Sequence, residues 1–132
     1  MALAVELSDS AQVLVTEVAA GISVDIVPRR VGTRPVSWAD FGDQIVVQVG
    51  DVGGRWEIGG GEEDLAFLED IVRSVVAGRV VEVFGKSRSR VVVILADGTR
   101  ETETGYEGPA GCLPMPLWPK WSRRVEYVPY EP

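Results

Sequence analysis

Carboxylates are the groups of this sequence best suited to chemistry, because the chain contains no histidine. The commonest general base near neutral pH is therefore missing, and Ser-His-Asp and Cys-His nucleophile systems are excluded. Two carboxylate pairs stand out, Glu101 with Glu103 on one face of an expected strand and Glu69 with Asp70 on the outer side of an expected helix. Such pairs act as acid and base only where their environments separate their pKa values, and both pairs are expected to be solvated. The sequence predicts no catalytic residue.

Metal, phosphate and thiol chemistry have equally little support. Zinc sites use His and Cys ligands, and the chain has only Cys112, which we expect to be a small buried hydrophobe. The acids of residues 40–70 lack EF-hand spacing. The glycines at 59–61 precede an expected helix, where a phosphate could bind, but the acids that follow would repel it and no P-loop lysine is present. We expect no metal and no cofactor.

Negative charge is concentrated in the middle of the chain. The net charge is −7, yet residues 40–70 hold nine acids against one base, Arg55. This segment would repel phosphate backbones, so nucleic acid is not an expected partner. It would attract a basic protein, although acids also serve simply to keep a small domain soluble. No apolar run is long enough to span a membrane, so no membrane partner is expected either.

The end of the chain combines tryptophan, tyrosine and proline with basic residues, a composition typical of binding hot spots. The competing interpretation is that these aromatic side chains fold back to fill the core. The leading hypothesis is a non-catalytic domain that binds a basic protein, as an immunity protein or inhibitor of a toxin would. The residues expected to contact this partner are Asp51, Glu62, Glu63, Asp64, Glu69, Asp70, Trp118, Trp121 and Arg123.

A small-molecule or enzymatic site is the alternative hypothesis. It would form where the proline-rich loop of residues 105–119 covers a sheet. Its apolar walls and polar contacts would come from Arg100, Glu101, Glu103, Tyr106, Trp118 and Trp121. A third, weaker hypothesis is a homodimer, made by pairing an exposed strand edge or by burying the aromatic residues near the chain's end.

The expected compartment is the cytoplasm. One cysteine rules out an intrachain disulfide framework. A signal peptide begins with a positively charged region, and the first 28 residues contain no Lys or Arg.

The elements that would position these residues are indicated by periodicity. Residues 8–10 have helix N-cap types, and apolar residues then recur at helical spacing until Gly21, which predicts a first helix. The competing interpretation is a strand through Val13 and Val15. A second helix, expected from Glu62 to Gly78, has acids in its first turn and a continuous apolar stripe.

Strands are expected where apolar residues alternate with polar ones or form short β-branched runs: 22–26, 45–49, 55–58, 81–83, 91–95 and 99–104. Residues 124–128 are a candidate for a last short strand. Residues 29–43 are expected to be a loop. The sequence thus predicts one α+β domain over residues 1–132, in the order α-β-β-β-α-β-β-β. Its sheet would be mostly antiparallel, with five to six strands and two helices on one face.

Overall fold

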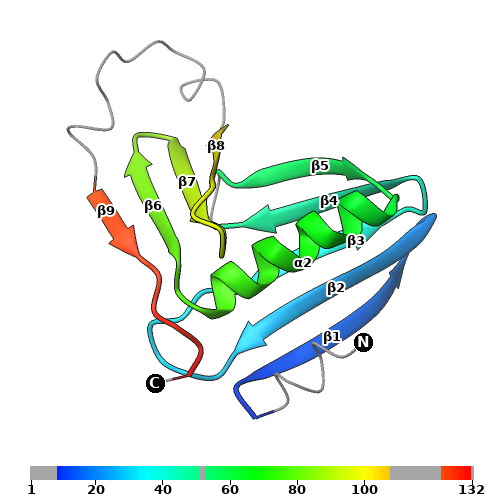
Figure 1. Cartoon of the computed structure of the whole chain (residues 1–132), viewed down its shortest axis with the longest axis horizontal. Coiled ribbons are helices and arrows are strands. Elements are labelled where there is room, and N and C mark those ends of the chain that lie inside the picture. The colour runs from blue at the N-terminus through cyan, green and yellow to red at the C-terminus, as the bar shows by residue number, and fades with distance from the viewer. Residues whose placement is uncertain (1–8, 51–52, 108–122, 132) are drawn as a thin grey trace.

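The computed structural model describes residues 9–50, 53–107 and 123–131. Within these residues the chain forms two antiparallel sheets and one helix (Figure 1). The first sheet has the order β1-β2-β3-β4-β5 and the second the order β8-β7-β6-β9. The elements are β1 (Ala11–Val18), β2 (Gly21–Pro28), β3 (Val36–Asp40), β4 (Gln44–Val49), β5 (Arg55–Gly59), α2 (Glu62–Val76), β6 (Val80–Gly85), β7 (Arg88–Ile94), β8 (Arg100–Tyr106) and β9 (Arg123–Glu126).

The predicted fold class is wrong, because the described chain is mostly β. The predicted first helix is strand β1, which pairs along its whole length with β2. Its valines and Thr16 are β-branched and stiff, which favours a strand. The spacing of its apolar residues fits the period of a helix as well as that of a strand. A two-residue turn joins the strands, with Ala20 in the left-handed region at φ 64°. The continuous pairing of β1 with β2 therefore overrides the helical pattern.

The predicted loop at residues 29–43 is also wrong in its second half. β3 lies there, paired with β2 on one side and β4 on the other. Val36 and Trp38 point into the core from this short strand, and both are buried. The first sheet is therefore a continuous meander in which every strand pairs with its neighbour in sequence.

The helix α2 confirms its prediction. Its first turn is acidic, and Leu68, Ile71, Val72 and Val75 are buried on one stripe. It ends at Ala77, after which Gly78 adopts a left-handed φ of 76°. Figure 1 shows α2 lying across one face of the first sheet.

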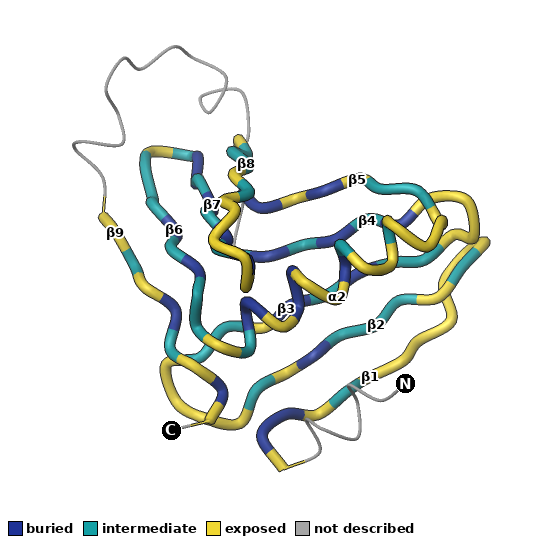
Figure 2. The backbone as a smooth tube through the Cα atoms, in the orientation of Figure 1, coloured by how far each residue is buried: buried dark blue, intermediate teal, exposed yellow. Residues whose placement is uncertain are grey.

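The core lies between that face, α2 and the second sheet. Buried side chains from both sheets and from α2 belong to one cluster, and Figure 2 shows burial declining toward β1. The β4–β5 loop joins the two sheets: the Gly53 N–H donates to the Ser89 hydroxyl, and a Cβ at Gly53 would lie 2.4 Å from the Ser89 carbonyl oxygen. Only glycine allows this close approach.

Candidate functional site

The acids at the start of α2 lie at one end of the molecule together with the turns of the first sheet. Figure 1 shows the β1–β2 turn, the β3–β4 turn and the start of α2 at this end. We call this surface the acidic end and define it by five acids and three apolar residues: Asp40, Asp43, Glu62, Glu63, Asp64, Ile22, Phe41 and Leu65. No Lys or Arg occurs in residues 17–28, 38–50 or 56–72.

Close backbone contacts hold the three turns together. A Cβ at Gly60, just before α2, would lie 2.4 Å from the carbonyl oxygen of Gly42 in the β3–β4 turn. A Cβ at Gly21 would lie 2.3 Å from the Asp40 carbonyl oxygen and 2.8 Å from the Phe41 ring. Because both positions tolerate only glycine, the backbone fixes where the acids of the turn lie relative to the acids of the helix.

Two of the five carboxylates of the acidic end accept hydrogen bonds from backbone N–H groups. The Asp40 carboxylate accepts a hydrogen bond from the Gly42 N–H at 2.8 Å, and the Asp64 carboxylate accepts one from the Gly61 N–H at 3.3 Å. Glu62 and Glu63 are exposed in the first helical turn, where the helix dipole stabilises negative charge. The acidic end is therefore a fixed anionic surface.

Apolar side chains are exposed within this surface. Ile22 is 46% exposed, Phe41 39% and Leu65 48%. Leu65 begins the same helical stripe as the buried Leu68 and Val72, yet it is itself exposed. Apolar groups surrounded by acids are what a partner with basic and apolar side chains would contact.

Glu69 and Asp70 continue the negative charge along the exposed side of α2, as predicted. Glu69 is paired with Arg73 at 2.9 Å, one helical turn away, so part of its charge is neutralised within the helix. Asp70 is exposed next to it. The helical acids therefore form one surface that is most negative at the start of α2.

The remaining predicted contact residues do not join this surface. Arg123 lies in β9, which Figure 1 shows at the opposite end of the molecule, and its guanidinium sits 4.8 Å from the centre of the Phe84 ring. Asp51, Trp118 and Trp121 lie outside the described residues, so their predicted role stays a prediction.

A buried polar cluster was not anticipated from the sequence. Glu82 is fully buried, because β6 turns Val80, Glu82 and Phe84 inward instead of Val81 and Val83. Its carboxylate accepts a hydrogen bond from the Tyr127 hydroxyl at 2.8 Å. Burial, and then the nearby Glu82 carboxylate, raise the pKa of Tyr127 above its usual value. No sequence signal marks this cluster, since valine on both sides of Glu82 leaves either face plausible.

The same cluster fastens the end of the chain to the first sheet. The Arg34 guanidinium lies about equally far from two rings, 5.8 Å from Phe84 and 6.0 Å from Tyr127. The Tyr130 hydroxyl donates to the Arg34 carbonyl oxygen at 2.7 Å. These contacts join the loop before β3, strand β6 and the segment after β9, which is a structural role.

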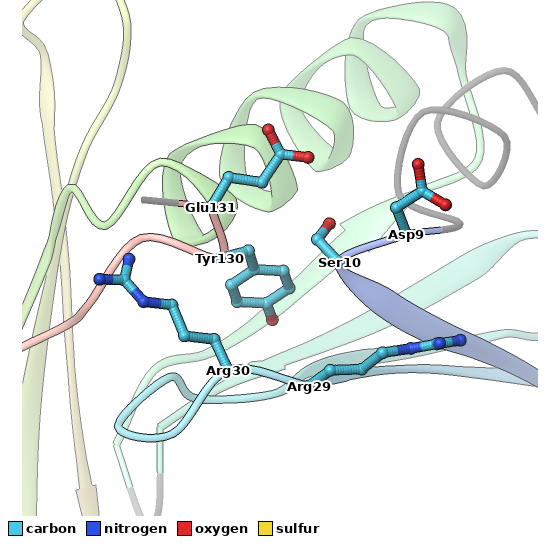
Figure 3. Close-up of a pocket in the computed structure, with 6 residues that line it drawn as sticks. All are labelled: Asp9, Ser10, Arg29, Arg30, Tyr130 and Glu131. Carbon is cyan, nitrogen blue, oxygen red and sulfur yellow. The ribbon is translucent and has the colours of Figure 1, made fainter.

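A shallow hollow of about 380 Å³ lies beside this segment, lined by Asp9, Ser10, Arg29, Arg30, Tyr130 and Glu131. Figure 3 shows the side chains of Arg29 and Arg30 pointing in opposite directions, with the Tyr130 ring between them. Arg30 is also engaged, because it donates to the Pro129 carbonyl oxygen at 3.1 Å. Ligand sites need polar groups that converge on one point, and these groups diverge.

The alternative site under residues 105–119 is only partly described. Glu101 and Glu103 lie opposite the buried Val93 and Val91, so they are half-buried on the inner face of the second sheet instead of solvated. Tyr106 is exposed, with the Arg88 guanidinium 5.4 Å from its ring centre. Trp118 and Trp121 lie outside the described residues, and this site stays a prediction.

Comparisons with protein-family models, with curated proteins and with solved structures give no match to this chain. No helix among the described residues is both long and apolar enough to cross a membrane.

Proposed function

We propose that this chain is a non-catalytic binding protein that holds a basic protein at its acidic end, in the manner of an immunity protein or inhibitor. The observation that carries the proposal is the gathering of carboxylates from the β3–β4 turn and the start of α2 around exposed apolar side chains. The two groups come from segments about twenty residues apart, held together by the contact between Gly60 and Gly42. We propose the cytoplasm as its compartment, since one cysteine allows no intrachain disulfide.

Both parts of this surface have a physical role in binding. The carboxylates attract a basic partner over a distance of about 8–10 Å at physiological salt, which raises the association rate. The side chains of Phe41 and Leu65 supply apolar area that is removed from water only once the partner docks. Affinity should therefore fall as salt rises, while the apolar contribution persists.

The competing explanation is that the acids of α2 serve only the helix. Glu62 and Glu63 interact favourably with the helix dipole, worth about 0.3–1 kcal/mol each. The two explanations predict different effects of neutralising these glutamates. Neutralising an acid that only stabilises the helix lowers the stability of the fold, whereas neutralising an acid that contacts the partner weakens binding. Asp64 is unsuitable for this comparison, since it also caps the Gly61 N–H.

The test compares the double variant Glu62→Gln/Glu63→Gln with a matched control, Glu107→Gln/Glu126→Gln. The control removes the same charge from two exposed positions away from the acidic end, one just after β8 and one in β9. Wild-type protein and both variants are used to capture proteins from the producing cells, and the candidates encoded beside the gene are examined first. A captured protein is then purified and its Kd measured by titration calorimetry at two salt concentrations. Thermal unfolding of each variant is measured alongside.

The proposal predicts a basic partner whose Kd rises at least tenfold for the Glu62→Gln/Glu63→Gln variant and by less than about threefold for the control. The loss should shrink at high salt, because screening weakens the contribution of the carboxylates. Equal affinity of both variants, or a partner with no net positive charge, contradicts the proposal. A variant that loses only thermal stability supports the helix-only explanation instead.

A further inference from the structure

Among the described residues, the long and largely apolar strand β1 forms the outer edge of the first sheet and is paired on one side only. Six of the eight residues of β1 are exposed, and the strand pairs with β2 in a continuous register without a bulge. Proteins usually protect such an edge with Lys, Pro, a bulge or a very short strand. β1 contains no Lys or Pro, and its only charge is Glu17. An edge with these properties is a template for a further strand.

The hydrogen-bonding groups of this edge can be assigned from the pairing with β2. The Arg29 N–H donates to the Ser10 carbonyl oxygen at 3.0 Å, just beyond the end of β2. Pro28, the last residue of β2, has no N–H and lies opposite Ala11. Hydrogen-bonded and non-hydrogen-bonded positions alternate along an antiparallel pair. The even residues of β1 therefore bond to β2, and the odd residues 11, 13, 15 and 17 direct their N–H and C=O groups outward.

We propose that β1 pairs antiparallel with β1 of a second copy of this chain, joining the two five-stranded sheets into one. The register that uses all four outward-facing residues places Val13 opposite Val15 and Ala11 opposite Glu17. Leu14 then lies on the two-fold axis, opposite Leu14 of the second copy. Directly opposed residues share a face of the sheet, so both copies of α2 lie on the same side.

The strand is self-complementary in this register, which favours a second copy as the occupant. Val15, 66% exposed in the single chain, is covered by Val13 of the other copy. The one charged residue, Glu17, faces an alanine, so no like charges are directly opposed. A basic strand from another protein would gain little here, since only one carboxylate is available. The β1–β2 turns point away from the two-fold axis, so the two acidic ends lie at opposite ends of the dimer and both stay free.

The first experiment blocks the edge without disturbing the sheet. Val15→Pro removes an outward-facing N–H, and proline is tolerated on edge strands at such positions. Leu14→Lys leaves the backbone unchanged and places two ammonium groups opposite each other at the two-fold axis. Mass is measured by size-exclusion chromatography with light scattering over a concentration series, and circular dichroism checks the fold of each variant.

The second experiment tests the register. Leu14→Cys, in a Cys112→Ser background, brings two Cα atoms about 4.5 Å apart at a non-hydrogen-bonded pair, within the range of a disulfide. Gln12→Cys in the same background is the matched control, because residue 12 lies opposite residue 16 and its two copies are about 13 Å apart. Crosslinking under mild oxidation is read on a non-reducing gel.

The inference predicts a wild-type dimer, monomeric folded Val15→Pro and Leu14→Lys variants, and crosslinking of Leu14→Cys only. Should Val15→Pro fail to fold, Leu14→Lys and the cysteine pair decide the question. A wild-type monomer at every concentration, a dimer that survives Leu14→Lys, or equal crosslinking at residues 12 and 14 would overturn it. Dimerisation should strengthen with salt, because each copy carries a net charge of −7, whereas binding of a basic partner should weaken.

Discussion

Removing the hydroxyl of Tyr127 should destabilise the fold more than removing the hydroxyl of Tyr130. The Tyr127 hydroxyl donates to the buried Glu82 carboxylate at 2.8 Å, and a hydrogen bond to a charged group contributes about 1.5–3 kcal/mol. The Tyr130 hydroxyl donates to a neutral carbonyl oxygen at 2.7 Å, a bond worth about 0.5–1.5 kcal/mol. We therefore expect Tyr127→Phe to lower the free energy of unfolding by about twice as much as Tyr130→Phe.

The assay is urea unfolding followed by tryptophan fluorescence, since Trp38 and Trp56 are buried in the first sheet. An unchanged m-value would show that the variants unfold from the same compact state. Glu82→Gln, alone and with Tyr127→Phe, completes a double-mutant cycle whose coupling energy should be about 1–3 kcal/mol.

Two results would refute this reasoning. Equal losses for Tyr127→Phe and Tyr130→Phe would show that the carboxylate does not strengthen the bond. A coupling energy near zero between Glu82 and Tyr127 would show that the two groups contribute independently, despite their short distance.

Three further predictions follow from the backbone and from the tyrosines. Gly60→Ala places a Cβ 2.4 Å from the Gly42 carbonyl oxygen and should cost about 1–3 kcal/mol in thermal unfolding, whereas Gly61→Ala, with 3.4 Å to its nearest neighbour, should cost less than about 1 kcal/mol. Ala20→Gly should raise the unfolding free energy by about 0.5–1 kcal/mol, because Ala20 has a φ of 64°; an unchanged urea midpoint would contradict this. Burial raises the pKa of Tyr130, so ionisation favours the unfolded chain: stability should hold below a pH of about 10 and fall above it, less steeply in Tyr130→Phe.

Local patterns in the sequence predicted most individual elements. Strands β2 and β4 to β9 and helix α2 were expected near their observed positions, because alternation, tight turns and helix signals act over a few residues. β1 was assigned to a helix, since its apolar residues fit both periods and only pairing with β2 decides between them. β3 was missed because its five residues are flanked by loop-forming residues and gain stability from both neighbouring strands.

The candidate site was predictable in part. The acids of α2 and their exposure follow from helical periodicity, whereas their closeness to Asp40 and Asp43 depends on how a distant turn packs against Gly60. The inward orientation of Glu82 was not predictable either, because Val80, Val81 and Val83 fit the core equally well and a shift of one residue reverses both faces. Long-range packing and pairing, and not local preference, decide these two features.

The meander of the first sheet has a consequence for how the protein is synthesised. Strands β1 to β5 and α2 follow one another along the chain, so each can pair or pack as soon as it leaves the ribosome. β6 pairs at once with β7 on one edge, but its other edge waits for β9, whose residue Val125 pairs with Glu82 more than forty positions earlier. A nascent chain would therefore leave that edge of β6 unpaired until residues 123–126 have been synthesised, and slow codons before them would lengthen that interval.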